Sequence, residues 1–196
     1  MEETVKQKLP HFRGALVELF ARIRWKLLMM MPNEGRIRVL RQHGVRIGED
    51  CLIYTTLFST EPYLVEIGDH VAISSGTSFV THDASGWVFR EHPKMDVFGR
   101  IHVGNNTFFG TSCTVLPGTQ IGSNCIIGSG SVVRGVIPDD SVVFGNPARV
   151  IMKTSLMKQL LVNHKHRLDT KYLPAKDKEK VLRRHFGLPE TGSRGE

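Results

Sequence analysis

The sequence is short of cysteine, of aromatic residues and of apolar runs long enough to cross a membrane. Its three cysteines fit neither a disulfide framework nor a CxxC metal site, and no cleavable signal peptide is recognised, so we expect a cytoplasmic protein. Aromatic residues make up only 8% and are not interleaved with a basic stripe, which argues against a nucleic acid partner. The remaining composition is ordinary, with 40% hydrophobic and 23% charged residues among 196, and predicts one packed domain with appendages.

The net charge of +7 is spread unevenly along the chain. Residues 1–47 carry 10 Lys and Arg against 4 acids, and residues 154–196 carry 10 against 5. Residues 48–153 carry 6 against 10, so the middle of the chain is acidic and both flanks are basic. The flanking charge is either simply solvated or meets phosphate groups or anionic lipid.

Apolar residues recur every six positions through the middle of the chain. One unbroken register consists of Val103, Phe109, Val115, Ile121, Ile127 and Val133, and small residues stand two places before most of its members, at Cys113, Thr119, Cys125 and Ser131. The same pattern surrounds Ile47 and Ile67. Cysteines at the small position are expected to fill space in a core. A period of six is neither helical nor simple alternation.

Six residues can form a short extended stretch and a corner, with the large aliphatic side chain pointing inward. Three such units close a triangular coil, and successive coils stack through backbone hydrogen bonds at about 4.8 Å. The period therefore predicts a prism-shaped parallel β-helix. An antiparallel sandwich of short strands is the alternative, but it does not require a fixed register over so many residues.

The repeat is carried by VRIGEDCLI, VEIGDHVAISSGTSFV, IHVGNNTFFGTSCTVLPGTQIGSNCIIGSGSVV and VIPDDSVVFGNPARVI, which together span residues 45–153. These stretches resemble the hexapeptide-repeat acyltransferases, and the pieces THD and WVFR are most similar to the branch that acts on sugars and surface polysaccharides. The resemblance implies a mainly β fold, a left-handed parallel β-helix, with helical flanks at residues 1–44 and 154–196. It also implies acetyl-CoA as co-substrate, no required metal, and a homotrimer with the donor groove between subunits.

The repeat is interrupted twice, and segments that leave a rigid scaffold tend to carry sites. Residues 54–65 displace the register by two positions. Residues 81–99 place Ser85 and Glu91 where aliphatic residues belong, and this polar insertion is the candidate site. His82 follows the coil residues directly, so it is expected at the exit from a rigid strand, where a neutral imidazole can accept a proton.

The resemblance implies a role for each polar residue of the insertion. His82 would be the general base, taking the proton of an acceptor hydroxyl during direct transfer from the thioester while backbone N–H groups stabilise the oxyanion. Asp83 would orient His82 or hydrogen-bond a sugar hydroxyl, unless it only caps a turn. Trp87 would stack on a sugar ring and Arg90 would contact a diphosphate or carboxylate of the acceptor, unless both are loop anchors.

The resemblance also implies donor-binding residues, namely Phe108, Thr111, Ser129, Gly130, Arg134, Asn146, Arg149 and Lys153. Phe108 would pack against the arm of acetyl-CoA, and the backbone near Thr111 and Ser129 would meet its amides. Cationic residues such as Arg149 would contact its phosphates. The sequence departs from the family where Arg134 and Gly135 replace the usual Thr-Lys, and where Met152 replaces a second basic residue.

The flanks carry weaker signals. Residues 12–31 have apolar positions at helical spacing interrupted by Arg and Lys, which predicts a helix that covers the open end of the prism or attaches shallowly to anionic lipid at the inner face of the membrane. The tail is expected to be helical from Thr154 and then charge-dense. LPETG at residues 188–192 resembles a sortase recognition sequence, but no apolar segment follows it, and we interpret it as coincidence.

Other functions stay open at this point. N-acetylation of a nucleotide-linked aminosugar or of an antibiotic is the nearest alternative to O-acetylation. A carbonic-anhydrase-like β-helix would use His82, His92 and His102 for zinc, although their spacing of ten matches no known ligand pattern. A scaffold that has kept the fold and lost the chemistry is the third alternative.

Overall fold

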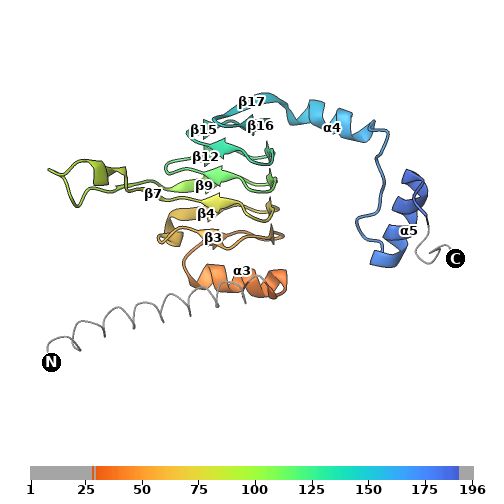
Figure 1. Ribbon diagram of the computed structural model, residues 1–196, viewed down its shortest axis with the longest axis horizontal. Helices are drawn as coiled ribbons and strands as arrows, with labels where there is room; N and C mark the ends of the chain where they lie inside the picture. The colour runs from red at the N-terminus through yellow and green to blue at the C-terminus, as the bar shows by residue number, and fades with distance from the viewer. Residues whose placement is uncertain (1–27, 29, 190–196) are drawn as a thin grey trace, which may run out of the picture. The chain divides into compact units, whose positions relative to one another are not determined.

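The computed structural model describes residue 28 and residues 30–189. The chain divides into two compact units, Met1–Met157 and Lys158–Glu196. The first unit contains a column of short strands from which one insertion projects, as Figure 1 shows. We call the strand-bearing part, residues 45–153, the column, and Lys158–Glu196 the C-terminal unit.

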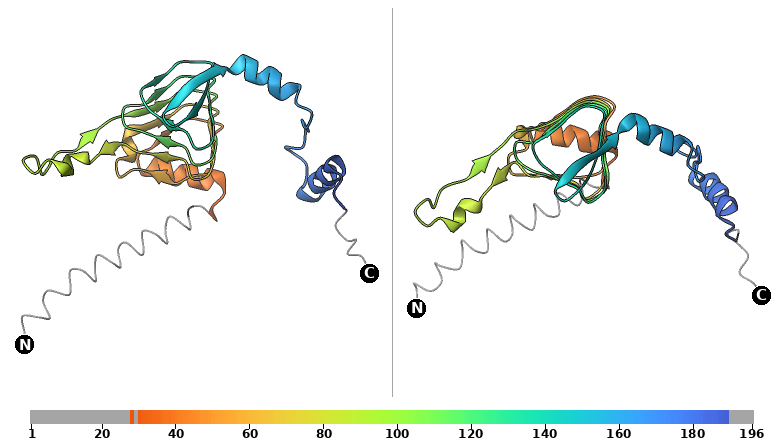
Figure 2. Two further views of the ribbon diagram at one scale, coloured as in Figure 1. Left: turned by 45° about the horizontal axis from the view of Figure 1, so that its top comes forward. Right: turned by 90° about the horizontal axis from the view of Figure 1, so that it is seen from above.

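The column is a parallel β-helix with a triangular outline, seen from above in Figure 2. Its first face contains β1 (Arg46–Ile47), β4 (Val65–Ile67), β9 (Ile101–Val103), β12 (Gln120–Ile121) and β15 (Val136–Ile137). The second contains β2 (Leu52–Ile53), β5 (Ala72–Ile73), β10 (Phe108–Phe109), β13 (Ile126–Ile127), β16 (Ser141–Gly145) and β17 (Ala148–Lys153). The third contains β3 (Leu57–Phe58), β6 (Ser78–Phe79), β11 (Thr114–Val115) and β14 (Val132–Val133).

The predicted six-residue register forms the core of the column. Each of its members is buried, and each stacks on its equivalent in a neighbouring coil, as in the pairs Val103–Ile121 and Phe109–Ile127. The small residues are buried as well, and the Thr119 hydroxyl donates to the carbonyl of Leu116 at 2.6 Å. All three cysteines are free and buried, so the prediction that they fill space is confirmed.

The corners of the coils depend on residues that tolerate unusual backbone geometry. Asn106 and Asn124 adopt positive φ angles of 53° and 59°, a region that asparagine enters more readily than most residues. Their side chains form a ladder along one edge, since Asn106 Nδ2 donates to Asn124 Oδ1 at 2.8 Å and Asn124 Nδ2 donates to Asp140 Oδ1 at 3.0 Å. Coil stacking is close here, because a Cβ on Gly104 would lie 2.6 Å from a backbone carbon of the next coil.

One end of the column is covered by α3 (Asn33–Gln42), which buries Ile37 and Leu40 against the first coil. Asn33 fastens the helix to that coil by donating to the Cys51 carbonyl at 2.8 Å and accepting from the Ile53 amide at 2.9 Å. The helix predicted for residues 12–31 falls almost wholly outside the described residues. Among the described residues, the helix that covers this end of the column is α3, which the sequence analysis had not singled out.

Both interruptions of the repeat are visible in the register. Ile47 pairs with Ile67, twenty residues later, whereas Val103 pairs with Ile121, eighteen residues later, so the first interruption adds two residues. It contains the short helix η1 (Pro62–Leu64). The second leaves the column as a hairpin of β7 (His82–Asp83) and β8 (Val97–Phe98), with η2 (Ser85–Val88) between them.

The column ends where β17 returns antiparallel along β16. The following residues form α4 (Thr154–Val162), as predicted, and α5 (Ala175–Phe186) lies farther along the chain. Neither helix buries a residue. Between residues 30 and 189, every helix is too short or too polar to cross a bilayer.

Candidate active site

His82 lies where the chain turns away from the column after β6. Thr81, directly before it, is buried, and its carbonyl accepts the amide of Gly99 at 2.9 Å, which closes the base of the hairpin. Across the hairpin His82 pairs with Phe98. The imidazole therefore stands on a rigid strand exit, in agreement with its predicted placement.

The imidazole is held by a carboxylate from the coil below. His82 Nδ1 lies 2.9 Å from Glu61 Oε2, and the hydroxyl of Ser59 is a more distant neighbour of the same nitrogen at 3.4 Å. Glu61 is itself fixed, because Thr60 donates to Oε1 at 2.6 Å and the buried Thr81 donates to Oε2 at 2.7 Å. A chain of hydrogen bonds thus locks both partners.

Glu61 is ionised at any ordinary pH. Hydrogen bonds from the hydroxyls of Thr60 and Thr81, with a smaller contribution from His82, lower its pKa to about 2, although partial burial acts in the opposite direction. An ionised carboxylate can only accept hydrogen bonds, so Nδ1 of a neutral His82 carries the proton. Nε2 then bears the lone pair, which is the arrangement that a general base requires.

The reactive nitrogen is accessible. Within the described part of the chain, both hydrogen bonds of the ring are made by Nδ1. The His82 side chain is 31% exposed, compared with 17% for Glu61. Phe98 flanks the imidazole with ring centroids 5.8 Å apart and is itself half exposed. The site therefore offers a solvent-accessible base between an ionic anchor and an aromatic wall.

Glu61 was missed by the sequence analysis, which noted the interruption at residues 54–65 only as a shift of register. The sequence did contain a signal for it. The interruptions at residues 54–65 and 81–99 leave the repeat at the same corner of successive coils, so they must lie close together. Coils of about eighteen residues place Glu61 and His82, which are 21 residues apart, at equivalent corners between the third and first faces.

The other predicted residues of the insertion have different surroundings. The Asp83 carboxylate accepts the amide of Ser85 at 2.8 Å, so it caps the turn, and the carboxylate that contacts the His82 ring is that of Glu61. The hydrogen bond from Ser85 also lowers the pKa of Asp83. A role of Asp83 in orienting His82 stays a prediction. Trp87, at 88% exposure, and Arg90 lie on the projecting hairpin and are open to solvent.

The predicted donor residues fall into groups. Thr111, Ser129 and Gly130 meet at one corner, where Ser129 Oγ accepts the Thr111 amide at 3.2 Å and the Gly130 amide donates to the Thr111 carbonyl at 2.8 Å. Phe108 lies on the outer surface of the second face and is half exposed. Arg134 occupies the corner between the third and first faces, as His82 does, but two coils farther along.

The remaining donor residues belong to the end of the column. Arg149 and Lys153 lie on β17, in the same sheet as Phe108, and Asn146 lies in the turn before it. Arg149 Nη1 donates to the Ala148 carbonyl at 3.1 Å, and Lys153 Nζ lies 3.5 Å from the Asp139 carbonyl. Both side chains remain exposed and able to receive phosphate.

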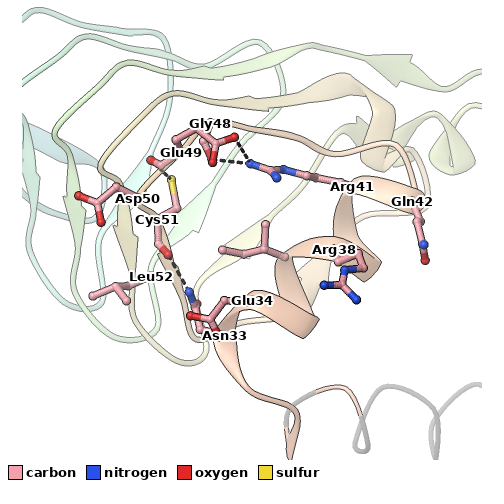
Figure 3. A pocket seen from close by; sticks show the side chains of 11 residues that line it. Asn33, Glu34, Arg38, Arg41, Gln42, Gly48, Glu49, Asp50, Cys51 and Leu52 are labelled. Carbon is pink, nitrogen blue, oxygen red and sulfur yellow. Dashed lines mark hydrogen bonds and ion pairs between the residues drawn. The ribbon is translucent and has the colours of Figure 1, made fainter.

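Two other features of the described residues lie apart from the predicted site. The described residues contain no group of three or more metal-ligating side chains, so His82, His92 and His102 do not assemble the zinc site considered above. A cavity of about 670 Å³ lies between α3 and the first coil, lined among others by Asn33, Arg41 and Cys51 (Figure 3). None of the predicted site residues lines it.

Comparison with known proteins agrees with this architecture. Residues 100–135 match the family model "Bacterial transferase hexapeptide (six repeats)". Protein CapG of Staphylococcus aureus is 45% identical over 130 residues, which cover 64% of this chain and 74% of CapG. The galactoside O-acetyltransferase of Escherichia coli K12 is 35% identical over 109 residues, which cover 55% of this chain and about half, 53%, of that enzyme.

Solved structures share the fold. A hexapeptide-repeat acetyltransferase of Vibrio cholerae superposes with a TM-score of 0.51 at 19% identity, covering 67% of this chain and 89% of that one. Its complex with acetyl coenzyme A gives 0.50 at 20% identity, covering 71% and 91%. The predicted fold class, a mainly β left-handed parallel β-helix with flanking helices, is thereby confirmed, and the chain belongs to the hexapeptide-repeat acyltransferases.

Proposed function

We propose that this protein transfers an acetyl group from acetyl-CoA to a hydroxyl of a saccharide, with His82 as the general base. The observation that carries the proposal is the His82–Glu61 pair, which leaves Nε2 unprotonated on a rigid and accessible strand exit. An oriented base of this kind contributes about 10²–10⁴ in rate. The other proposed residues bind the acetyl donor and the acceptor.

In the proposed reaction the acceptor hydroxyl gives its proton to His82 Nε2 as its oxygen attacks the thioester carbonyl. The C–S bond then breaks, and the imidazolium returns the proton to the departing thiolate, so the enzyme ends in its starting state. Glu61 stabilises the imidazolium through the 2.9 Å contact to Nδ1 and prevents the ring from turning. Backbone N–H groups would stabilise the oxyanion.

The donor fits the outer surface of the column. The half-exposed Phe108 offers an apolar wall for the arm, the backbone near Thr111 and Ser129 is close to the surface, and Arg149 and Lys153 offer charge for phosphates. Arg134, Gly130 and Asn146 complete the proposed donor set. The Vibrio cholerae relative, whose fold is the same, is known in complex with acetyl coenzyme A.

The acceptor is proposed from the hairpin and from one relative. Trp87 presents an almost fully exposed indole that can stack on a sugar ring, and Arg90 can contact an anionic group of the acceptor. Asp83 keeps one carboxylate oxygen free of its turn bond and can accept from a sugar hydroxyl. The Escherichia coli relative is named for O-acetylation of galactosides. An amine of an aminosugar is the alternative nucleophile.

A homotrimer is part of the proposal, since the donor surface on one subunit would need a neighbour to form a groove. The three unpaired thiols and the use of acetyl-CoA favour a reducing cytoplasm. Attachment of residues 12–31 to the inner membrane surface is also proposed, and most of that segment lies outside the described residues.

The test compares two histidine variants of the same hairpin. With a galactoside acceptor, release of CoA thiol should fall by about 10²–10⁴ in His82→Ala, because the base is lost. The control His92→Ala removes an exposed imidazole from the same insertion and should retain the wild-type rate. Equal rates for wild type and His82→Ala, with the fold intact, would rule out His82 as the base.

A further inference from the structure

None of the described residues of the C-terminal unit, residues 158–189, is buried. Its helices have 9 and 12 residues, counting all of α4, and neither buries a residue. Isolated helices of this length are marginal in water, since most of their stability in proteins comes from packing an apolar face. The unit therefore needs a surface to pack against.

Four apolar residues of this region form two pairs on helix faces. Leu156 and Leu160 are four residues apart on α4, and Leu182 and Phe186 are four apart on α5, so each pair shares one side of its helix. Leu160, Phe186 and the following Leu188 are about half exposed. Phe186 leans against the His166 ring with centroids 5.2 Å apart and remains half open to solvent.

The charge of the unit indicates what kind of surface it meets. Within the described residues 158–189, each of the three acids already contacts a cation: Asp169 with Arg167, Asp177 with Lys180 and Glu179 with Arg183. Six cations in the same range have no acidic partner: Lys158, Lys165, Lys171, Lys176, Lys178 and Arg184. The surplus is therefore available to an anionic partner.

We propose that the C-terminal unit is a docking module for an anionic phospholipid bilayer, on which α5 lies in the interface. Basic helices with leucine and phenylalanine on one side bind such surfaces through apolar insertion and attraction to acidic headgroups. A partner with charge alone would leave the leucines and Phe186 in water, and an apolar partner alone would bury unpaired cations. The bilayer surface satisfies both, and the proposal stands whether or not His82 is catalytic.

The experiment uses the full chain and two kinds of vesicle. The protein should cosediment with mixed phosphatidylcholine and phosphatidylglycerol vesicles and not with phosphatidylcholine alone, and added salt should release it. The double variant Lys176→Gln/Lys178→Gln should bind about ten- to thirtyfold more weakly, since each cation near an anionic bilayer contributes roughly fivefold. Leu188→Ser should weaken binding as well, because insertion is lost.

The matched control is Arg38→Gln/Arg100→Gln, which removes the same charge from exposed positions outside the C-terminal unit and should bind vesicles as wild type does. Equal binding of wild type and the Lys176/Lys178 variant would overturn the proposal. Absence of lipid binding in wild type would overturn the proposal too. If the Lys176/Lys178 variant then also changed the oligomeric state, the unit would pack on a second copy of the chain instead of on a bilayer.

Discussion

Replacing Glu61 by Gln should change how the stability of the protein depends on pH. The pKa of Glu61 is lowered from 4.5 to about 2 by hydrogen bonds that favour the ionised carboxylate, chiefly from Thr60 and Thr81. Because the pKa in the folded state lies below that of the unfolded chain, the resulting stabilisation is present above about pH 4.5 and is lost as the pH falls towards 2. At 1.36 kcal/mol per pK unit, the full effect is at most about 3 kcal/mol, and about half of it remains near pH 3.

The measurement is the free energy of unfolding by urea for wild type and Glu61→Gln, taken at about pH 6 and about pH 3. The difference between the two proteins isolates Glu61, since all other groups titrate in both. We expect the advantage of wild type to shrink by roughly 1–2 kcal/mol between these pH values. Glu91→Gln, an exposed carboxylate of the hairpin, is the control and should show a difference that hardly depends on pH. A wild-type advantage that is the same at both pH values would refute the assigned cause of the shift.

Three further outcomes follow from the same structure. In steady-state kinetics, Glu61→Gln should lower kcat by about 10²–10³ and leave the Michaelis constant for acetyl-CoA unchanged. The reason is that the amide of Gln can donate to Nδ1 of His82 and so favour the tautomer that carries the proton on Nε2. Ile127→Ala should lower the free energy of unfolding in urea by about 2–5 kcal/mol, since the Ile127 side chain is fully buried. Ile126 is partly exposed, so Ile126→Ala should lower it clearly less. Equal losses of stability in the two variants would contradict the inward register. The three cysteines should resist a thiol reagent until the protein unfolds, because burial raises the pKa of each thiol, and rapid labelling of the folded protein would count against a closed core.

The column could be predicted from the sequence because its rule is local. A large aliphatic residue every six positions, with a small residue two places before it, is sufficient to decide which side chains point inward, and Val103 to Val133 all do so. The same rule identified residues 81–99 as a segment that cannot stay in the coil. The sequence was therefore sufficient to locate His82 at the exit of a strand.

The cap on the column shows where such reasoning stops. The periodic apolar pattern drew attention to residues 12–31 and not to α3 at Asn33–Gln42, which covers the first coil. Its apolar side has only Ile37 and Leu40 buried, and the buried Arg36 donates to the carbonyl of Ile53 in the first coil. A short helix fastened by polar contacts to distant carbonyls leaves little trace in a hydrophobic pattern.

The partner of His82 was decided by tertiary structure alone. Asp83 is adjacent in sequence and was the natural candidate, but on a strand successive side chains point to opposite sides, and Oδ1 of its carboxylate accepts the Ser85 amide. Glu61 reaches the imidazole because one coil of the column returns the chain to the same corner after about twenty residues. The sequence alone determined the periodic column and the residues that it excludes. The tertiary structure decided which of the residues outside the repeat contact each other. Stacking brings together positions that are one full coil apart, so the length of the coil selects the pair, and a shift of two residues would select a different one.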